Sequence, residues 1–253
     1  MRTAQYQSVD EIRSGLLLMT MYGAIALFVK TPGISPVKTR LAKELGVDAA
    51  ESFHLAAARA VAAVINASGK QTALQGFYAV AEQSALADDL WQGLPCLWQG
   101  EGGLGERMSL VYETLLKQYD FVILVGADIP QMTVKHLLKA ADWLARDEHA
   151  RFAFGPSVDG GFWLFGGNCS LPHNLWTDVT YSAADTGQQF LNKIDSLGEM
   201  QTITPLQDVD ELQDLIHLHE SLRLLSDPMP EQLELIRFLE SLPLNFFKGF
   251  GYV

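Results

Sequence analysis

Asp128 is placed where an acidic side chain could bind a ligand. It follows five large apolar residues, Phe121 to Val125, and stands two residues after Gly126. Such a run is typical of a strand buried on both faces in the middle of an α/β sheet, and Pro130 prevents the strand from continuing. Because ligands bind at the carboxyl edge of open α/β sheets, the strand would deliver this acid to the binding edge. The alternative is that Asp128 only caps the turn into the next helix.

Asp208 and Asp210 form a second acidic feature, with one residue between them. If the backbone is extended there, both carboxylates project to the same side, where they repel each other unless a cation lies between them. The alternative is that both cap the helix that follows, which suits aspartate at a helix N-terminus.

Three cations, Lys30, Lys38 and Arg40, lie in a loop that follows an apolar strand at 24–29. A loop in this position is a natural place to bind phosphate groups. The spacing is neither that of a P-loop nor that of a dinucleotide-binding glycine turn. A solvated basic loop would have the same composition.

Glycines mark two further loops. In the segment 99–108, which begins with Gln99, four glycines precede a helix whose first turn carries Arg107; glycine lets a backbone approach a ligand closely, although a plain strand-to-helix connection is an equal alternative. Asp159, Gly160 and Gly161 form an ordinary hairpin turn between two aromatic strands, and hairpin geometry alone would explain them.

Strands and helices must alternate to position these loops, which predicts one α/β domain with flanking extensions. We expect an N-terminal extension at 1–22, the domain at 23–227, and a C-terminal helix with an aromatic tail at 228–253. The tail should pack on the domain or on a second subunit, as in a homodimer. The expected strands are 24–29, 72–80, 95–98, 121–126, 152–156, 162–165 and 201–204, and the expected helices are 48–66, a helix from the glycine loop to about 118, 133–146, 185–195, a helix from 210 to about 225, and 231–241.

Composition narrows the class of function. The 253 residues carry a net charge of −12, which argues against nucleic acid or an anionic membrane as the main partner. The two cysteines, Cys96 and Cys169, are expected to be free thiols. An apolar run at 16–29 is short for a membrane span and lacks a clear cleavage site, so we expect a cytoplasmic protein.

The order of these motifs resembles one bacterial family. The motifs are Lys30-x-Pro-x5-Lys38-Thr-Arg-Leu, Leu-Gly-Glu-Arg-Met at 104–108, Val-Gly-Ala-Asp-Ile-Pro at 125–130, Gly-Pro-x-x-Asp-Gly-Gly at 155–161 and Asp-Val-Asp at 208–210. The chain thereby resembles the glycosyltransferase-A-like proteins called radical-SAM/selenodomain-associated transferases. These are similar to nucleotide-diphospho-sugar transferases and, distantly, to 2-phospholactate guanylyltransferase.

The resemblance implies a three-layer α/β/α sandwich with a central mixed, mostly parallel sheet. It implies Mg²⁺ or Mn²⁺ bound by Asp128, Asp208 and Asp210, and catalytic roles for Asp128, Lys38 and Arg40. The expected donor is a nucleoside di- or triphosphate or a nucleotide-sugar, and the acceptor is a small molecule. It also implies substrate contacts from residues of the same motifs: Lys30, Thr39, Gly105, Arg107, Asp159, Gly160 and Gly161. Gln99, at the start of the glycine-rich loop, is expected to contact the substrate as well.

Two departures from the family pattern bear on activity. Ile34, Ser35 and Pro36 stand where the family usually has Pro-Gly-Arg, and Gly103 replaces a usual aspartate. The expected function is therefore metal-dependent glycosyl or nucleotidyl transfer, which the sequence does not separate. The alternative is a non-catalytic binder of nucleotides or phosphorylated metabolites.

Overall fold

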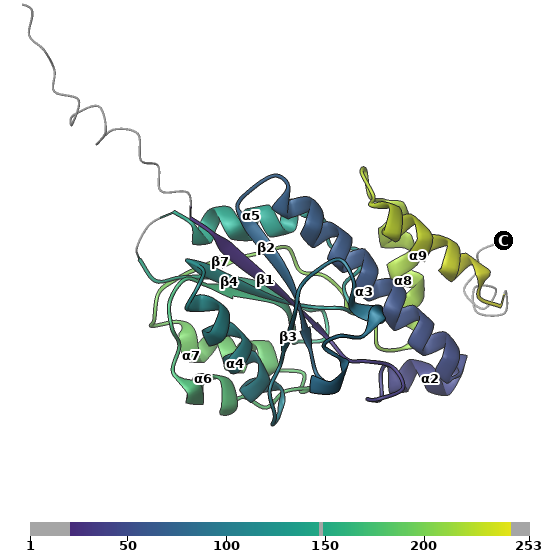
Figure 1. Ribbon diagram of the computed structural model, residues 1–253, viewed down its shortest axis with the longest axis horizontal. Helices are drawn as coiled ribbons and strands as arrows, with labels where there is room; N and C mark the ends of the chain where they lie inside the picture. The colour runs from purple at the N-terminus through teal and green to yellow at the C-terminus, as the bar shows by residue number, and fades with distance from the viewer. Residues whose placement is uncertain (1–20, 147–148, 244–253) are drawn as a thin grey trace, which may run out of the picture.

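The computed structural model describes residues 21–146 and 149–243, which form a three-layer α/β/α structure around one seven-stranded sheet (Figure 1). The N-terminal extension up to residue 20 and the aromatic tail from 244 lie outside the described residues. The strand order is β3-β2-β1-β4-β6-β5-β7. The strands are β1 (Gly23–Val29), β2 (Leu74–Val80), β3 (Cys96–Trp98), β4 (Phe121–Gly126), β5 (Arg151–Pro156), β6 (Phe162–Gly167) and β7 (Glu199–Thr202).

The sheet is mixed and mostly parallel, as predicted. β1 pairs in parallel with β2 and β4, β2 pairs in parallel with β3, and β5 pairs in parallel with β7. Only β6 runs in the opposite direction, between β4 and β5. The other six strands therefore all end at the same edge of the sheet, where ligands bind in folds of this kind.

Helices cover both faces of the sheet. In Figure 1, α3 and α5 lie on one side and α4, α6 and α7 on the other, which confirms the predicted three layers. Beyond α3, the helices α2, α8 and α9 share a separate hydrophobic cluster with it. The helices are α2 (Thr39–Leu45), α3 (Val47–Gly69), α4 (Leu104–Leu116), α5 (Val134–Leu144), α6 (His173–Thr177), α7 (Thr186–Ile194), α8 (Leu212–Arg223) and α9 (Pro230–Ser241), with short 3-10 turns at Gln83–Ala85 and Asp89–Trp91.

β4 is the central strand that the apolar run predicted. Val122 and Leu124 pack into the layer of α4, α6 and α7, whereas Phe121, Ile123 and Val125 pack into the layer of α3 and α5. All five side chains are at most 3% exposed. Burial on both faces explains why the sequence here shows a continuous apolar run rather than an alternating one.

Three local predictions were wrong. Residues 39–45, where no helix was predicted, form α2, because Leu41 anchors this short helix in the cluster formed with α3, α8 and α9. The segment 169–184, where no helix was predicted, contains α6, whose Leu175 and Trp176 are buried. The last strand runs from Glu199 to Thr202 rather than over 201–204, in register with Arg151 to Phe154 of β5. In the first two cases tertiary burial determined the structure rather than local propensity.

The remaining expectations concern the cysteines, membrane spans and α9. Cys96 and Cys169 are free thiols. In the described part of the chain, no helix is long and apolar enough to cross a membrane. Leu235 and Leu239 of α9 pack into the cluster formed with α3 and α8. We propose that α9 belongs to the same domain as the sheet.

Candidate metal-binding site

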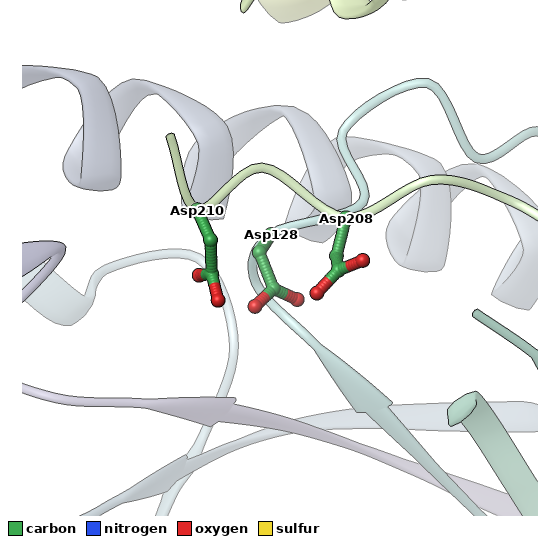
Figure 2. A group of neighbouring side chains, drawn as sticks. All are labelled: Asp128, Asp208 and Asp210. Carbon is green, nitrogen blue, oxygen red and sulfur yellow. The ribbon is translucent and has the colours of Figure 1, made fainter. Parts of the chain in front are cut away.

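Three aspartates meet at the carboxyl edge of the sheet. Asp128 comes from the turn after β4, and Asp208 and Asp210 come from the segment that follows β7. One carboxylate oxygen from each lies within 4.8 Å of the others, and the three side chains point to the same side in Figure 2. The structure thus brings together the three residues that the resemblance assigned to a metal ion.

Asp208 and Asp210 project to one side of their segment (Figure 2). The residue between them, Val209, points the other way into the core with 1% exposure, and its backbone N–H donates to the carbonyl of Asp128 at 3.2 Å. The alternative, that both aspartates cap the next helix, does not describe the segment. The carboxylate of Asp214 caps the helix instead, since it accepts from the N–H groups of Asp210 and Glu211 just before α8.

Lys38 supplies a cation between two of the acids. Its Nζ lies 3.2 Å from Oδ2 of Asp128 and 3.1 Å from Oδ1 of Asp210, and its side chain is 10% exposed. Burial alone would lower the pKa of Lys38, but the two carboxylates outweigh it and raise the pKa above its usual value. Burial likewise opposes ionisation of Asp128, yet Lys38 holds the pKa of Asp128 below its usual value. Both groups are therefore charged at neutral pH.

The backbone of Lys38 adopts a conformation that is uncommon for a residue with a side chain. Its φ and ψ are 43° and 47°, in the left-handed region, immediately before α2 begins. Non-glycine residues in this region carry strain that the surrounding structure must offset, and they cluster at functional sites. The residue in this conformation is the one whose ammonium contacts Asp128 and Asp210.

Among the described residues, Asp208 forms no ion pair with a cationic side chain. Burial, then the charges of Asp128 and Asp159, raises the pKa of Asp208 to about 7. A third acid is thus crowded against a pair that Lys38 only partly compensates. A donor set made only of carboxylate oxygens suits a hard divalent cation such as Mg²⁺ or Mn²⁺. The chemistry of the donor set therefore fits the metal that the resemblance implies.

The other residues of the cationic loop lie around this cluster. Arg40, at the start of α2, places Nη1 3.4 Å from Oδ2 of Asp210, with 61% of its side chain exposed. Thr39 is the first residue of α2 and is exposed. The Lys30 side chain is also exposed, and the Lys30 carbonyl accepts from Nε2 of His54 at 2.9 Å. Arg40 and Lys38 are thereby brought together with the acids.

His54 is a neighbour of the site that sequence reasoning missed. Burial lowers its pKa, so the ring is neutral when it holds the Lys30 carbonyl. The same loop is held by Glu82, whose Oε2 accepts from the Thr31 N–H at 2.9 Å, while Nε1 of Trp91 donates to the Thr31 hydroxyl. Oε1 of Glu82 is buried without a hydrogen-bond partner among the described residues. No spacing in the sequence pointed to these residues, because they come from three separate elements.

The glycine-rich loop is held to the sheet by Gln99 and Arg107. Gln99 is 4% exposed, and its Nε2 donates to the carbonyls of Val29 and Ala79 at the ends of β1 and β2. Nε of Arg107 turns back to donate to the Gly102 carbonyl at 2.9 Å. These contacts bring both residues to the binding edge, and their contact with a ligand stays a prediction.

Gly105 has a packing reason to be glycine. A Cβ at this position would lie 2.3 Å from the carbonyl oxygen of Trp176 in α6. The close approach is therefore between α4 and α6, which is an alternative to the predicted approach to a ligand.

The turn of Asp159, Gly160 and Gly161 also lies at the carboxyl edge, since it follows β5. The Asp159 carboxylate accepts from the Gly161 N–H at 2.9 Å. Gly160 has a φ of 92°, and its carbonyl accepts from the N–H of Gly187 in α7 at 2.8 Å. The turn is therefore held against α7, with Asp159 close enough to raise the pKa of Asp208.

Gln232 of α9 fixes the turn that carries Asp128, and sequence reasoning missed it. It is 1% exposed, and its Nε2 donates to the carbonyls of Pro130 at 2.7 Å and Met132 at 3.0 Å. Its Oε1 accepts from the N–H of Met229. A single glutamine on the last described helix therefore satisfies two backbone acceptors beside the acid cluster.

A mixed sheet with acids at its carboxyl edge has the fold of nucleotide-diphospho-sugar transferases. A candidate nucleotide-diphospho-sugar transferase from Desulfovibrio desulfuricans G20 is 24% identical, with a TM-score of 0.76 over 88% of this chain and 97% of that one. A cytidylyltransferase from Leptospira borgpetersenii is 11% identical, with a TM-score of 0.50 over 92% of this chain and 99% of that one. A nucleotidyl transferase from Methanothermobacter is 11% identical, with a TM-score of 0.51 over 80% and 98%.

A comparison of the sequence with protein families gives one match. Residues 58–183 match a family described as "Uncharacterized protein conserved in bacteria (DUF2064)". No protein of curated function matches the sequence significantly. Asp128 lies inside the matched residues, whereas Lys38, Arg40, Asp208 and Asp210 lie outside them. The structural similarities confirm the predicted fold.

Proposed function

We propose that this protein is a divalent-metal-dependent transferase that moves a glycosyl or nucleotidyl group from a nucleotide or nucleotide-sugar donor to a small acceptor. The observation that carries the proposal is the convergence of Asp128, Asp208 and Asp210 at the carboxyl edge of the sheet. Carboxylates that are crowded together in this way repel one another, and a divalent cation between them would remove that repulsion. The fold supports the class of donor, since its solved neighbours include nucleotidyl transferases.

The three aspartates would hold Mg²⁺ or Mn²⁺. The ion would supply positive charge to offset the negative charge that develops on the diphosphate as its bond to the transferred group breaks. The chain's own cations would add to this charge from one side: Lys38 from within the acid cluster, and Arg40 from the exposed start of α2. Arginine can bind two phosphate oxygens at once, whereas lysine acts as a single strong point charge.

Further residues at the same edge would complete the binding of donor and acceptor. Lys30 begins the loop after β1, and Thr39 lies between Lys38 and Arg40 at the start of α2, so both would contact phosphates. Asp159, with its glycine turn, would face the acceptor, because it lies across the acid cluster on the side of Asp208. Gln99 and Arg107 would present the glycine-rich loop to the donor.

Replacing Asp128 tests the proposal. Asp128→Asn should abolish Mn²⁺-dependent nucleotide binding in calorimetry and lower the transfer rate by ~10² or more, the scale for removing a key electrostatic stabiliser. The fold should persist, since Lys38 keeps Asp210 as a partner. Asp142→Asn, an exposed acid on α5, is the matched control and should change neither quantity. Nucleotide binding by Asp128→Asn that equals the wild type would refute the metal assignment.

A second candidate function is non-catalytic binding of a nucleotide or phosphorylated metabolite. It is favoured by Gly103, which stands at the start of α4 where the family usually has an aspartate; its N–H is occupied by Oε2 of Glu106 at 2.7 Å. Incubation with nucleotides, nucleotide-sugars and phospho-acids in the presence of Mn²⁺ separates the two functions. Product formation supports the transferase, and tight binding without turnover supports the binder.

A further inference from the structure

The segment that carries Asp208 and Asp210 is tied down along its whole length. Before the pair, the Gln207 carbonyl accepts from Nε2 of Gln131 at 2.6 Å. Between the two acids, the Val209 N–H donates to the Asp128 carbonyl at 3.2 Å. After the pair, the Asp210 and Glu211 N–H groups donate to Oδ2 of one carboxylate in the first turn of α8, at 2.9 and 2.8 Å. That carboxylate belongs to Asp214.

Asp214 also holds the segment from its other end. Its Oδ1 accepts from Nε2 of Gln207 at 2.8 Å. One side chain therefore joins residue 207 to residues 210 and 211, so the Asp-Val-Asp tripeptide lies inside a closed loop of hydrogen bonds. The loop leaves the backbone of residues 208–210 little freedom to turn either aspartate away.

We infer that Asp214 is a positioning residue of the metal site, which fixes the segment 207–211 so that Asp208 and Asp210 face Asp128. The inference rests on the proposed function for the identity of the metal, and on the structure alone for the geometry. Two like-charged side chains beside a third would otherwise relax by swinging apart, so a tether is needed for them to stay close before a cation binds.

The chemistry of a carboxylate suits this position better than that of an amide. An ionised aspartate only accepts hydrogen bonds, through two oxygens, and all three of its partners here are N–H donors. Asparagine would turn an NH₂ group toward one of these donors. The negative charge is also favourable in the first turn of a helix, as Asp214 is in the 12-residue α8.

An ordinary helix cap would account for only part of this arrangement. In a capping box, the side chain of the third helical residue accepts from the N–H of the N-cap residue, which is Glu211 here. The contacts of Asp214 with the Asp210 N–H and the Gln207 side chain lie outside that pattern. They reach toward the acids, and they distinguish a tether from a cap.

Amide hydrogen exchange on Asp214→Ala tests the geometry without any metal. Asp214 does not bond to the Val209 N–H, so a cap would leave exchange at Val209 as it is in the wild type. A tether predicts exchange at Val209 about tenfold faster or more, because the Val209–Asp128 bond opens when the segment is freed. Asp214→Asn keeps the size of the side chain and serves as a second variant in case the alanine variant does not fold.

Mn²⁺ titration calorimetry on the same variants adds the functional readout. Partners that orient metal ligands are worth 10- to 100-fold in metal affinity, so the Mn²⁺ dissociation constant should rise by about that factor. Glu113→Ala is the matched control: its carboxylate also accepts from a loop, at the Ser170 hydroxyl and the Leu171 N–H, but after β6 at the opposite edge of the sheet. It should leave Mn²⁺ affinity unchanged.

The outcomes separate this inference from the proposed function. Faster exchange at Val209 together with weaker Mn²⁺ binding supports both. If the wild type binds no Mn²⁺ but exchange at Val209 is faster in the variants, Asp214 holds the segment as inferred, and the proposed metal-dependent function is overturned. Exchange at Val209 that matches the wild type in both Asp214 variants overturns the inference, whatever the Mn²⁺ affinity.

Discussion

Replacing Lys38 by methionine should strengthen the binding of Mn²⁺ alone. The Lys38 ammonium lies between Asp128 and Asp210, where it serves as a counter-ion for the acids. A divalent ion held by Asp128, Asp208 and Asp210 would compete with the ammonium for these carboxylates. Lys38→Met keeps much of the length of the side chain but removes the charge, so the ion no longer has a competitor.

The size of the effect follows from the exposure of the three groups. The Lys38 side chain is 10% exposed, but Asp128 and Asp210 are 35% and 43% exposed, so solvent screens both pairs. Exposed pairs contribute about 0–1 kcal/mol and breaking a buried pair costs about 3–5 kcal/mol, so we expect an intermediate loss of about 1–3 kcal/mol in metal-free stability. If the ammonium stabilises the acids by this free energy, it weakens Mn²⁺ binding to the wild type by roughly 5- to 150-fold, since about 1.4 kcal/mol is a factor of ten. Lys38→Met should bind Mn²⁺ more tightly by the same factor.

Two measurements check this value. Calorimetric titration gives the Mn²⁺ affinity of each variant, and melting temperatures with and without Mn²⁺ show whether the ion stabilises Lys38→Met more than the wild type. With a nucleotide present, Lys38→Met should bind Mn²⁺ more weakly than the wild type, because the variant lacks a cation for the phosphates. Lys43→Met, at an exposed lysine in α2, the helix that follows Lys38, controls for the change in net charge.

One result would refute the reasoning about Lys38. If Lys38→Met binds Mn²⁺ alone as weakly as the wild type, or more weakly, the ammonium does not compete for the cation position. Its contact with the acids would then be a structural ion pair only.

Two further predictions concern Asp208 and the turn at Gly160. Because the pKa of Asp208 is raised from 3.8 to about 7 in the folded protein, its contribution to metal-free stability is present below pH 3.8 and is lost as pH rises through 7. Melting temperatures in chelator from pH 4 to 8 should therefore fall less steeply for Asp208→Asn than for the wild type, and parallel curves would contradict the assignment. Gly160→Ala should lose ~2 kcal/mol or more in urea unfolding, because its φ is 92° and a Cβ would lie 1.8 Å from the Ala184 carbonyl oxygen. Gly33→Ala, with a φ of 80° and open space around it, should cost only ~1 kcal/mol for the backbone, and equal losses at both positions would show that the contact with Ala184 is unimportant.

Local patterns in the sequence were enough to predict the acids but not their cation. The apolar run before Asp128 and the two-residue spacing of Asp208 and Asp210 each fix a direction over a few residues, and the structure has both. The ion pairs of Lys38 join residues 90 and 172 positions apart, and no local pattern encodes such a distance. The left-handed backbone conformation of Lys38 could not be predicted either, since nothing in a lysine side chain favours that conformation.

The polar contacts behind the site were harder still to predict. The spacing of Glu211 and Asp214 is typical of a helix start, so it could have indicated a cap, but the bond from Gln207 depends on the path of the segment after β7. Gln99 occurs in a glycine-rich loop, which suggested a ligand contact, yet its amide is occupied by strand carbonyls. Glutamines satisfy whichever backbone groups the fold brings near them, and this becomes visible only once the fold is known.

The contact of Gln232 with the turn after β4 has a consequence for the order of assembly. Gln232 follows Pro130 by 102 residues, so the turn that carries Asp128 must wait for α9 to be synthesised before its carbonyls are satisfied. At roughly 5–20 residues per second, this wait is about 5–20 s on the ribosome. The sheet strands up to β4 can pair during that interval, whereas the acid cluster reaches its final geometry only after α9 has left the ribosome.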